Sequence, residues 1–229
     1  MEVKRIERKF ILNTQESLFV KKRLENIMPK DHFCLTSDGY EVRSLYFDTI
    51  SDRACAEKED GLQIHEKIRA RIYGSSNDTI KLESKKKYGD FQVKSTMLID
   101  SQTLLALCRG NYSVLLSNPN PMAMYFYQKL SQGMFPKAII QYKRFSFCIP
   151  TNNTRITFDS NITATESNLD LFQNPLLAHP ILSQDTVIME VKYNHFLLGY
   201  IKDALAEVQQ SCSSYSKYFN GRTFYRYLI

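Results

Sequence analysis

The chain has 229 residues, of which 43% are hydrophobic and 24% are charged, as is ordinary for a soluble globular protein. Its net charge of +6 favours an anionic partner, whether nucleic acid, an acidic membrane surface or a phosphate compound, without choosing among these classes. No apolar run approaches the roughly 20 residues that a membrane span needs, and the N-terminal stretch MEVKRIERKF lacks the apolar region of a signal peptide. The five cysteines are widely spaced, without a CxxC pair, which argues against a zinc site and indicates a reducing, cytoplasmic compartment.

The first predicted elements are a strand and a helix. In RIERKFIL, residues 5–12, charged and apolar side chains alternate as in a strand with one polar and one apolar face, except that Arg8 falls on the apolar side. Helical spacing follows over residues 14–28 and ends before Pro29. The apolar stripe of this helix needs a sheet face to cover.

The middle of the chain predicts a meander of strands. Strand patterns cover residues 40–49, 63–74, 77–89 and 91–99. A short helix over residues 51–61, ended by Gly61, separates the first two strands. The expected turns of the meander contain Gly74, Asn77, Gly89 and Asp90.

The C-terminal half returns from helices to strands. Residues 101–135 carry helical spacing, and strand patterns follow over 137–149, 154–162 and 186–194. A helix over about residues 196–210 and an aromatic segment complete the chain. Seven or eight strands with peripheral helices predict an α+β fold, in which one sheet is curved or closed into a barrel. Because no linker or repeat interrupts the sequence, we expect residues 1–229 to form a single domain.

The positive charge is concentrated on the polar faces of the predicted strands. These faces carry eleven cations, namely Arg5, Lys9, Lys67, Arg69, Arg71, Lys81, Lys85, Lys94, Arg144, Arg155 and Lys192. They carry four anions, Glu7, Glu83, Asp159 and Glu190, so their sum is +7 against +6 for the whole chain. A sandwich whose charged faces meet solvent is one interpretation. If helices instead cover the apolar faces, the charged faces point inward and must stay hydrated or hold an extended polyanion.

The stretch KIRARIYG, residues 67–74, contains the side chains that could bind such a polyanion. Lys67, Arg69 and Arg71 alternate with Ile68, Ala70 and Ile72, which separates three cations from three apolar side chains. Guanidinium groups bind phosphate oxygens in pairs, and lysines add point charge. One hypothesis is therefore a tunnel that binds a chain of phosphates. The simpler alternative is a strand whose charged face is exposed to water.

Eight short stretches together resemble one known family. In chain order they are ERKF, VRSLYFDT, KIRARIYG, KLESKKK, QYKRFSF, TRITFDSNI, IMEVKYN and SKYFNGR. They resemble the triphosphate tunnel metalloenzyme superfamily, and specifically its VTC domain, the polyphosphate polymerase domain known from the vacuolar transporter chaperone complex. The resemblance implies an antiparallel β-barrel tunnel of about eight strands with helices packed outside. It also implies a transferase that uses ATP and a divalent metal, manganese or magnesium.

The resemblance also implies roles for individual residues. The residues implied to bind phosphate are Lys9, Arg69, Arg71, Lys85, Lys94, Arg144, Arg155, Ser216 and Lys217. The residues implied to be catalytic are Arg69, Arg71, Arg144 and Glu190. Glu190 would also hold the metal, against the alternative of a plain salt bridge with Lys192, and Glu7 and Glu83 are weaker metal or salt-bridge candidates. Asp48 is left open between a ligand and a structural cap.

One departure from the superfamily pattern bears on the reaction. Hydrolase members carry an ExExK strand, whereas this chain has Arg5 at the first glutamate position. Hydrolysis needs a water that is oriented and deprotonated, whereas a polymerase uses a phosphate that is already anionic and needs no base. The loss of this carboxylate therefore favours a polyphosphate polymerase that transfers the terminal phosphoryl group of ATP to a growing chain.

Two alternatives to the polymerase stay open at this point. A tripolyphosphatase or nucleoside triphosphatase would use the same cations, and a binding module would hold polyphosphate without turnover. Nucleic-acid binding is not expected, because the cations are spread over many strands and no nucleic-acid motif is evident. The expected ligands are ATP and inorganic polyphosphate, no membrane span is expected, and an export partner is left open.

Overall fold

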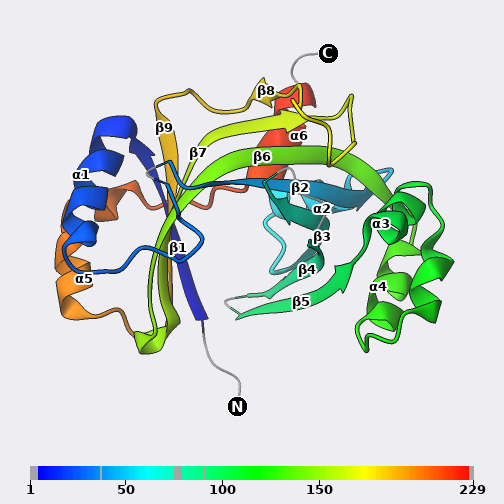
Figure 1. The fold of residues 1–229 in the computed structure, drawn as a ribbon, viewed down its shortest axis with the longest axis horizontal. Coiled ribbons are helices and arrows are strands. Elements are labelled where there is room, and N and C mark those ends of the chain that lie inside the picture. The colour runs from blue at the N-terminus through cyan, green and yellow to red at the C-terminus, as the bar shows by residue number, and fades with distance from the viewer. Residues whose placement is uncertain (1–4, 37, 75–78, 90, 227–229) are drawn as a thin grey trace. The chain divides into compact units, whose positions relative to one another are not determined.

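The computed structural model describes residues 5–36, 38–74, 79–89 and 91–226 and divides into two compact units (Figure 1). Unit 1 comprises Met1–Glu41, Tyr142–Thr163 and Pro180–Ser216. Unit 2 comprises Val42–Gln141, Ala164–His179 and Lys217–Ile229. The expectation of a single domain stays a prediction.

The secondary structure follows the alternation of the sequence closely. The strands are β1 Arg5–Asn13, β2 Tyr40–Thr49, β3 Ile64–Tyr73, β4 Ile80–Tyr88, β5 Phe91–Ile99, β6 Met134–Ile149, β7 Thr154–Thr165, β8 His179–Pro180 and β9 Thr186–Asn194. The α-helices are α1 Thr14–Glu25, α2 Arg53–Glu59, α3 Ser101–Cys108, α4 Ala123–Leu130, α5 Gly199–Ala204 and α6 Lys217–Arg226. The short 3-10 helices are η1 Tyr112–Ser117, η2 Thr151–Asn153 and η3 Ala206–Ser211.

In unit 1, one face of the sheet is covered by helices. The strand order is β1-β9-β7-β6, and β9 pairs antiparallel with both β1 and β7. The apolar side chains of these strands form a buried cluster with side chains of α1 and α5, including Phe10, Leu24, Phe158 and Ile201. α1 begins at a capping box in which Asn13 and Glu16 satisfy each other's backbone N–H groups. The opposite face of β1 and β9 keeps the charged residues.

Unit 2 contains the expected meander. The strand order is β6-β2-β3-β4-β5, and β2, β3, β4 and β5 pair antiparallel with one another in turn. Ile68, Ala70 and Ile72 are fully buried in a cluster that includes Leu107 of α3 and Phe126 of α4. The apolar side of KIRARIYG therefore lies under helices, as the implied fold with helices packed outside requires.

The α+β fold class is confirmed, with an antiparallel sheet of the expected size and helices packed on its apolar faces. Some boundaries differ. The predicted helix over residues 14–28 ends at Glu25, and the one over 196–210 is α5 followed by η3. Gly89 has φ of 54° in the turn before β5, as a tight turn requires. The turn residues Asn77 and Asp90 lie outside the described residues. No helix in the described part of the chain is long and apolar enough to cross a membrane.

Candidate functional site

The polar faces of β3, β4 and β5 in unit 2 carry a large excess of positive charge. By strand register these faces hold one carboxylate, Glu83, and seven cations, Lys67, Arg69, Arg71, Lys81, Lys85, Lys87 and Lys94. Lys67, Lys85 and Lys94 lie in one cross-strand row, and Arg71 lies opposite Lys81. Like charges directly opposite each other destabilise a sheet. The arrangement is therefore one that folding alone does not favour.

Glu83 is the centre of this cationic face. Its Oε2 atom lies 2.8 Å from Arg69 Nη2 and 3.7 Å from Arg71 Nη1, and its Oε1 atom lies 2.5 Å from Lys94 Nζ. The carboxylate is buried, whereas the Lys94 side chain is half exposed. Three cations thus gather on one carboxylate, and we call these four residues the Glu83 cluster.

The cations of the Glu83 cluster keep the Glu83 carboxyl group deprotonated. Burial alone would raise the pKa of Glu83, but Arg69 and Arg71 hold the pKa far below its ordinary value of 4.5. The carboxylate is therefore ionised at every physiological pH. The same arginines lower the pKa of the buried Tyr46 hydroxyl against the opposing effect of burial. The local potential is strongly positive, which favours anions.

Two polar residues of β2, neither of them predicted as a site residue, hold the arginines in place. Arg69 Nη1 donates to Tyr46 Oη at 3.0 Å, and Arg71 Nε donates to Ser44 Oγ at 3.0 Å. In the register these pairs lie directly opposite each other on β2 and β3. The signal was present, because Ser44 and Tyr46 alternate along VRSLYFDT with buried apolar residues. Both arginines are thereby oriented before any ligand binds.

In unit 1, carboxylates and lysines alternate on the polar faces of β1 and β9. Lys192 Nζ lies 2.6 Å from Glu190 Oε2 and 3.9 Å from Glu7 Oε2. Lys9 Nζ lies 3.6 Å from Glu7 Oε1 and donates to the Tyr215 carbonyl oxygen at 2.8 Å. The salt bridge between Glu190 and Lys192 that the sequence allowed is therefore present. The two carboxylates nevertheless share one side of the sheet and one lysine.

The two arginines of unit 1 that were predicted to bind phosphate, Arg144 and Arg155, form ion pairs with aspartates. Arg144 Nε and Nη2 donate to Asp159 Oδ1 and Oδ2 at 2.6 and 2.7 Å, a bidentate pair that is buried. Burial opposes the charge of Arg144, but Asp159 raises its pKa well above the ordinary value. Arg155 Nη2 lies 2.7 Å from Asp31 Oδ2. Asp31 was missed because it lies in a loop, where no periodicity marks it.

Glu190 and Glu7 of unit 1 are the candidate ligands of the divalent metal that the resemblance implies. Among the described residues, no three side chains of the His, Cys, Asp or Glu type gather closely enough to hold an ion. Magnesium is commonly bound by one or two carboxylates together with substrate phosphates and waters. Glu190 and Glu7 supply oxygen donors of the right kind on adjacent strands. They fit an ion that arrives with a phosphate ligand.

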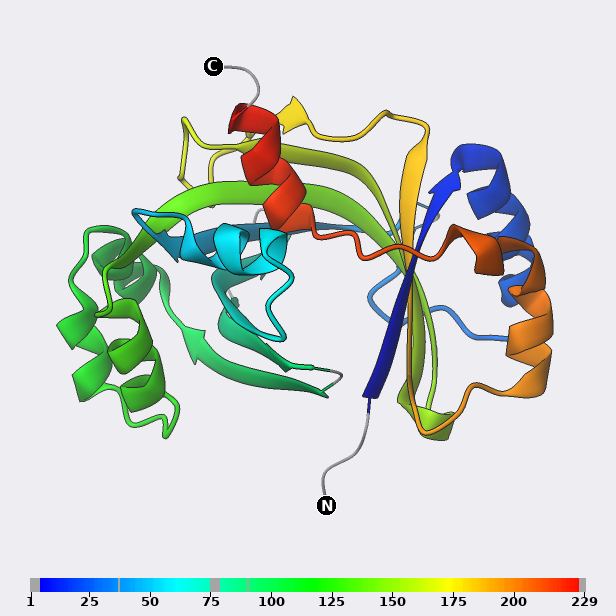
Figure 2. The ribbon, with the colours of Figure 1, turned by 180° about the vertical axis from the view of Figure 1, so that it is seen from behind.

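The segment around Asp48 anchors the C-terminal helix of unit 2. Asp48 is fully buried, accepts hydrogen bonds from the Ala54 backbone N–H at the start of α2, and accepts one from Tyr218 Oη at 2.8 Å. α2 and α6 lie side by side (Figure 2). Asp48 therefore acts as a cap and an anchor.

Lys217 is the first residue of α6 and follows directly on Ser216.

The structure brings the predicted residues into two groups. Arg69, Arg71 and Lys94 gather on Glu83 in unit 2, whereas Lys9 and Glu190 lie opposite each other in unit 1. Lys85 lies in the cationic row of β4. The roles assigned to all of these residues stay predictions.

Comparison with known proteins gives one family match. A family model described as the VTC domain matches residues 4–225. No curated protein matches the sequence. The solved structures that share the fold include the following two. One is a Hippeastrum protein assigned as an adenylyl cyclase and described as having a dominant triphosphatase activity, with a TM-score of 0.55, 11% identity and 96% of each chain covered. The other is a Vibrio parahaemolyticus protein assigned as an adenylate cyclase, with a TM-score of 0.51, 10% identity, and coverage of 94% of this chain and 96% of that one.

Proposed function

Because this chain belongs to the VTC domain family, we propose that it is a polyphosphate polymerase that transfers the terminal phosphoryl group of ATP to inorganic polyphosphate. The observation that carries the proposal is the cationic face of β3, β4 and β5, with seven cations and one carboxylate. A polyphosphate chain repeats its negative charge at every phosphorus, so it matches an extended row of cations. A ligand with a single charge would use only part of this face.

The Glu83 cluster is proposed to bind the phosphates. Glu83 fixes the guanidinium of Arg69, and Ser44 and Tyr46 accept hydrogen bonds from Arg71 and Arg69. An arginine held in this way loses little conformational freedom when it binds, so more of its interaction energy reaches the phosphate. Arg69 and Arg71 would stabilise the charge on the phosphoryl group during transfer, and Lys85 and Lys94 would hold the chain.

The proposed reaction exchanges one phosphoanhydride bond for another. A terminal oxygen of polyphosphate attacks the γ-phosphorus of ATP and forms a new P–O–P bond. The bond from this phosphorus to the bridging oxygen breaks, and its electron pair leaves on ADP. Because the attacking oxygen is already anionic, no residue of the chain has to remove a proton. Catalysis then requires only that the protein position the two substrates and stabilise the negative charge on the transferred phosphoryl group.

The proposed metal, manganese or magnesium, would be held by Glu190, with Glu7 as the second carboxylate. Such an ion neutralises charge on the phosphates to which it binds. Lys192 lies within 2.6 Å of Glu190 and within 3.9 Å of Glu7. The positive charge of this lysine offsets the mutual repulsion of the two carboxylates.

The test is to incubate the pure protein with ATP and manganese and to identify the products. A polymerase yields one ADP for each phosphate incorporated into an acid-labile polymer. Arg71→Ala should abolish synthesis while the circular dichroism spectrum is unchanged. Release of orthophosphate without polymer would overturn the proposal and support a triphosphatase, the activity described for the Hippeastrum protein that shares the fold. Tight polyphosphate binding without any turnover would support a binding module.

A further inference from the structure

Unit 1 contains a pocket on the helix-covered side of its sheet. The pocket has a volume of about 340 Å³ and is lined by residues of β1, β9, α5 and the segment between β9 and α5. Phe10 and Val191, which line it, point to the side opposite Lys9 and Glu190, because successive side chains of a strand alternate between faces. The pocket is thus separated by the sheet from the residues proposed to act on phosphate in unit 1.

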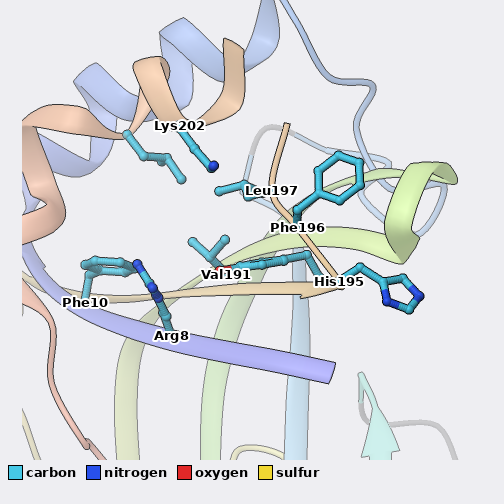
Figure 3. A pocket seen from close by; sticks show the side chains of 9 residues that line it. Arg8, Phe10, Val191, His195, Phe196, Leu197 and Lys202 are labelled. Atoms are coloured by element: carbon cyan, nitrogen blue, oxygen red, sulfur yellow. The ribbon is translucent and has the colours of Figure 1, made fainter. Parts of the chain in front are cut away.

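Cations and apolar groups share the lining of this pocket. Figure 3 shows Arg8 on one side and Lys202, reaching from α5, on the other, with Val191 and Leu197 between them. Both cations are exposed, and within the described part of the chain neither makes an ion pair. Arg8 is also the residue that broke the alternation of β1, since it lies on the face otherwise occupied by apolar side chains. An exposed guanidinium on this face costs little only where it reaches water or an anion.

The end of the pocket is shaped by a strained backbone. His195 has φ of 58° and Phe196 follows it, and both line the pocket. The Asn152 side chain donates a hydrogen bond to the Phe196 carbonyl oxygen at 2.8 Å, which fixes this turn. Phe196 is 58% exposed, although its side chain is large and apolar. Left-handed backbone at a non-glycine residue is costly and is found disproportionately at ligand sites.

We propose that this pocket binds a small organic anion that carries an aromatic ring. The ring would lie against Phe196 and the apolar floor of Val191 and Leu197, and the negative group would bind between Arg8 and Lys202 and contact both. A pocket of a few hundred Å³ with an apolar floor and a few polar groups is typical of small-molecule sites. The proposal does not depend on the reaction of this protein, because the pocket lies on the other face of the sheet.

The test uses 1-anilinonaphthalene-8-sulfonate, a probe with aromatic rings and one negative group, and measures its fluorescence on titration with the folded protein. We expect one binding site. Arg8→Ala and Lys202→Ala should each weaken binding about tenfold, as the loss of a charge-assisted hydrogen bond does. Phe196→Ala should weaken it as well. The matched control is Lys22→Ala, which removes one exposed cation of unit 1 outside the pocket and should leave binding unchanged.

Two comparisons make the result decisive. N-phenyl-1-naphthylamine, which has the rings without the charge, and inorganic phosphate, which has the charge without a ring, should each compete poorly. Equal competition by the neutral compound, or binding that survives both cation substitutions, overturns the proposal. Displacement of the probe by tripolyphosphate together with loss of binding in Arg69→Ala would place the probe on the cationic face of unit 2 instead. That outcome also overturns the proposal that the pocket binds an aromatic anion, but it does not contradict the proposed polymerase activity.

Discussion

Arg69 and Glu83 lie directly opposite each other on β3 and β4, and Arg69 Nε and Nη2 approach the same carboxylate oxygen at 2.9 and 2.8 Å. Glu83 is 1% exposed, so this contact is shielded from water on the carboxylate side. The pair fixes a guanidinium in position and leaves the surrounding face with a net positive charge. It thus links the stability of unit 2 to its proposed ligand.

Removing the charge of Glu83 should destabilise unit 2. Glu83→Gln leaves Arg69 and Arg71 without their shared carboxylate, and loss of one partner of a buried ion pair costs about 3 kcal/mol. Urea denaturation at pH 7 measures the free energy of unfolding. The control is Glu57→Gln, which removes the exposed i,i+4 pair with Arg53 and should cost under about 0.5 kcal/mol. Equal losses in the two variants would contradict the role of the Glu83 cluster. Tripolyphosphate, which binds the folded state, should stabilise all three proteins, and it should stabilise Glu83→Gln most, because there it replaces the carboxylate beside Arg69 and Arg71.

The lowered pKa of Glu83 predicts a dependence of stability on pH. Since the folded pKa is below the ordinary value of 4.5, the contribution of this carboxylate is complete above that pH and is lost as the pH falls toward the folded pKa. The free energy of unfolding should therefore decline below about pH 4.5, and more steeply in the unaltered protein than in Glu83→Gln. Glu57→Gln should follow the unaltered protein. If the free energy of unfolding falls in parallel with pH in all three proteins, the pKa of Glu83 is not lowered in the folded state.

Two lysines of β4 provide a matched test of phosphate binding. Lys85 lies in the row with Lys67 and Lys94, whereas Lys87 is exposed near the end of the strand. Lys85→Ala should weaken tripolyphosphate binding about tenfold, because it removes a charge-assisted contact, and Lys87→Ala should change it less than twofold. Isothermal titration calorimetry at constant salt measures both. If Lys87→Ala weakens binding as much, only the total charge of the face matters.

The metal assignment predicts a specific loss in Glu190→Gln. Without this carboxylate, manganese affinity in the presence of tripolyphosphate should fall at least about tenfold, since an ionic oxygen ligand is replaced by an amide. Electron paramagnetic resonance of free manganese gives the affinity directly. Glu7→Gln should have a smaller effect, and Glu57→Gln should have none. Unchanged manganese binding in Glu190→Gln would remove this residue from the metal site.

The Tyr218 hydroxyl should stabilise the contact between α6 and Asp48. Tyr218→Phe removes the 2.8 Å hydrogen bond to a fully buried carboxylate, at a cost of about 1–3 kcal/mol. Burial, with Asp48 beside it, raises the pKa of Tyr218, so the hydroxyl remains a donor throughout the neutral range. Thermal unfolding measures the change. Tyr200→Phe alters an exposed tyrosine and should leave the melting temperature unchanged. A similar loss in both variants would show that the hydrogen bond is not the cause.

The face on which a strand residue lies could be predicted from the sequence, and individual contacts could not. The two faces of KIRARIYG were assigned correctly because side chains of a strand alternate whatever the strand pairs with. The separation of Glu83 from Arg69 by fourteen positions carries no periodic signal. Only the register of β3 and β4 places them together. Asp31 was missed for a related reason, since a loop residue has no face until the chain folds.

The sequence by itself determined the strands, their polar and apolar sides, the excess of cations and the family. Each of these depends on residues close together in the chain or on their composition. The tertiary structure decided which cations gather on Glu83, that Arg144 and Arg155 pair with aspartates, and that Arg8 lines a pocket. These contacts join residues far apart in sequence, and strand register and helix packing bring them together only in the folded chain.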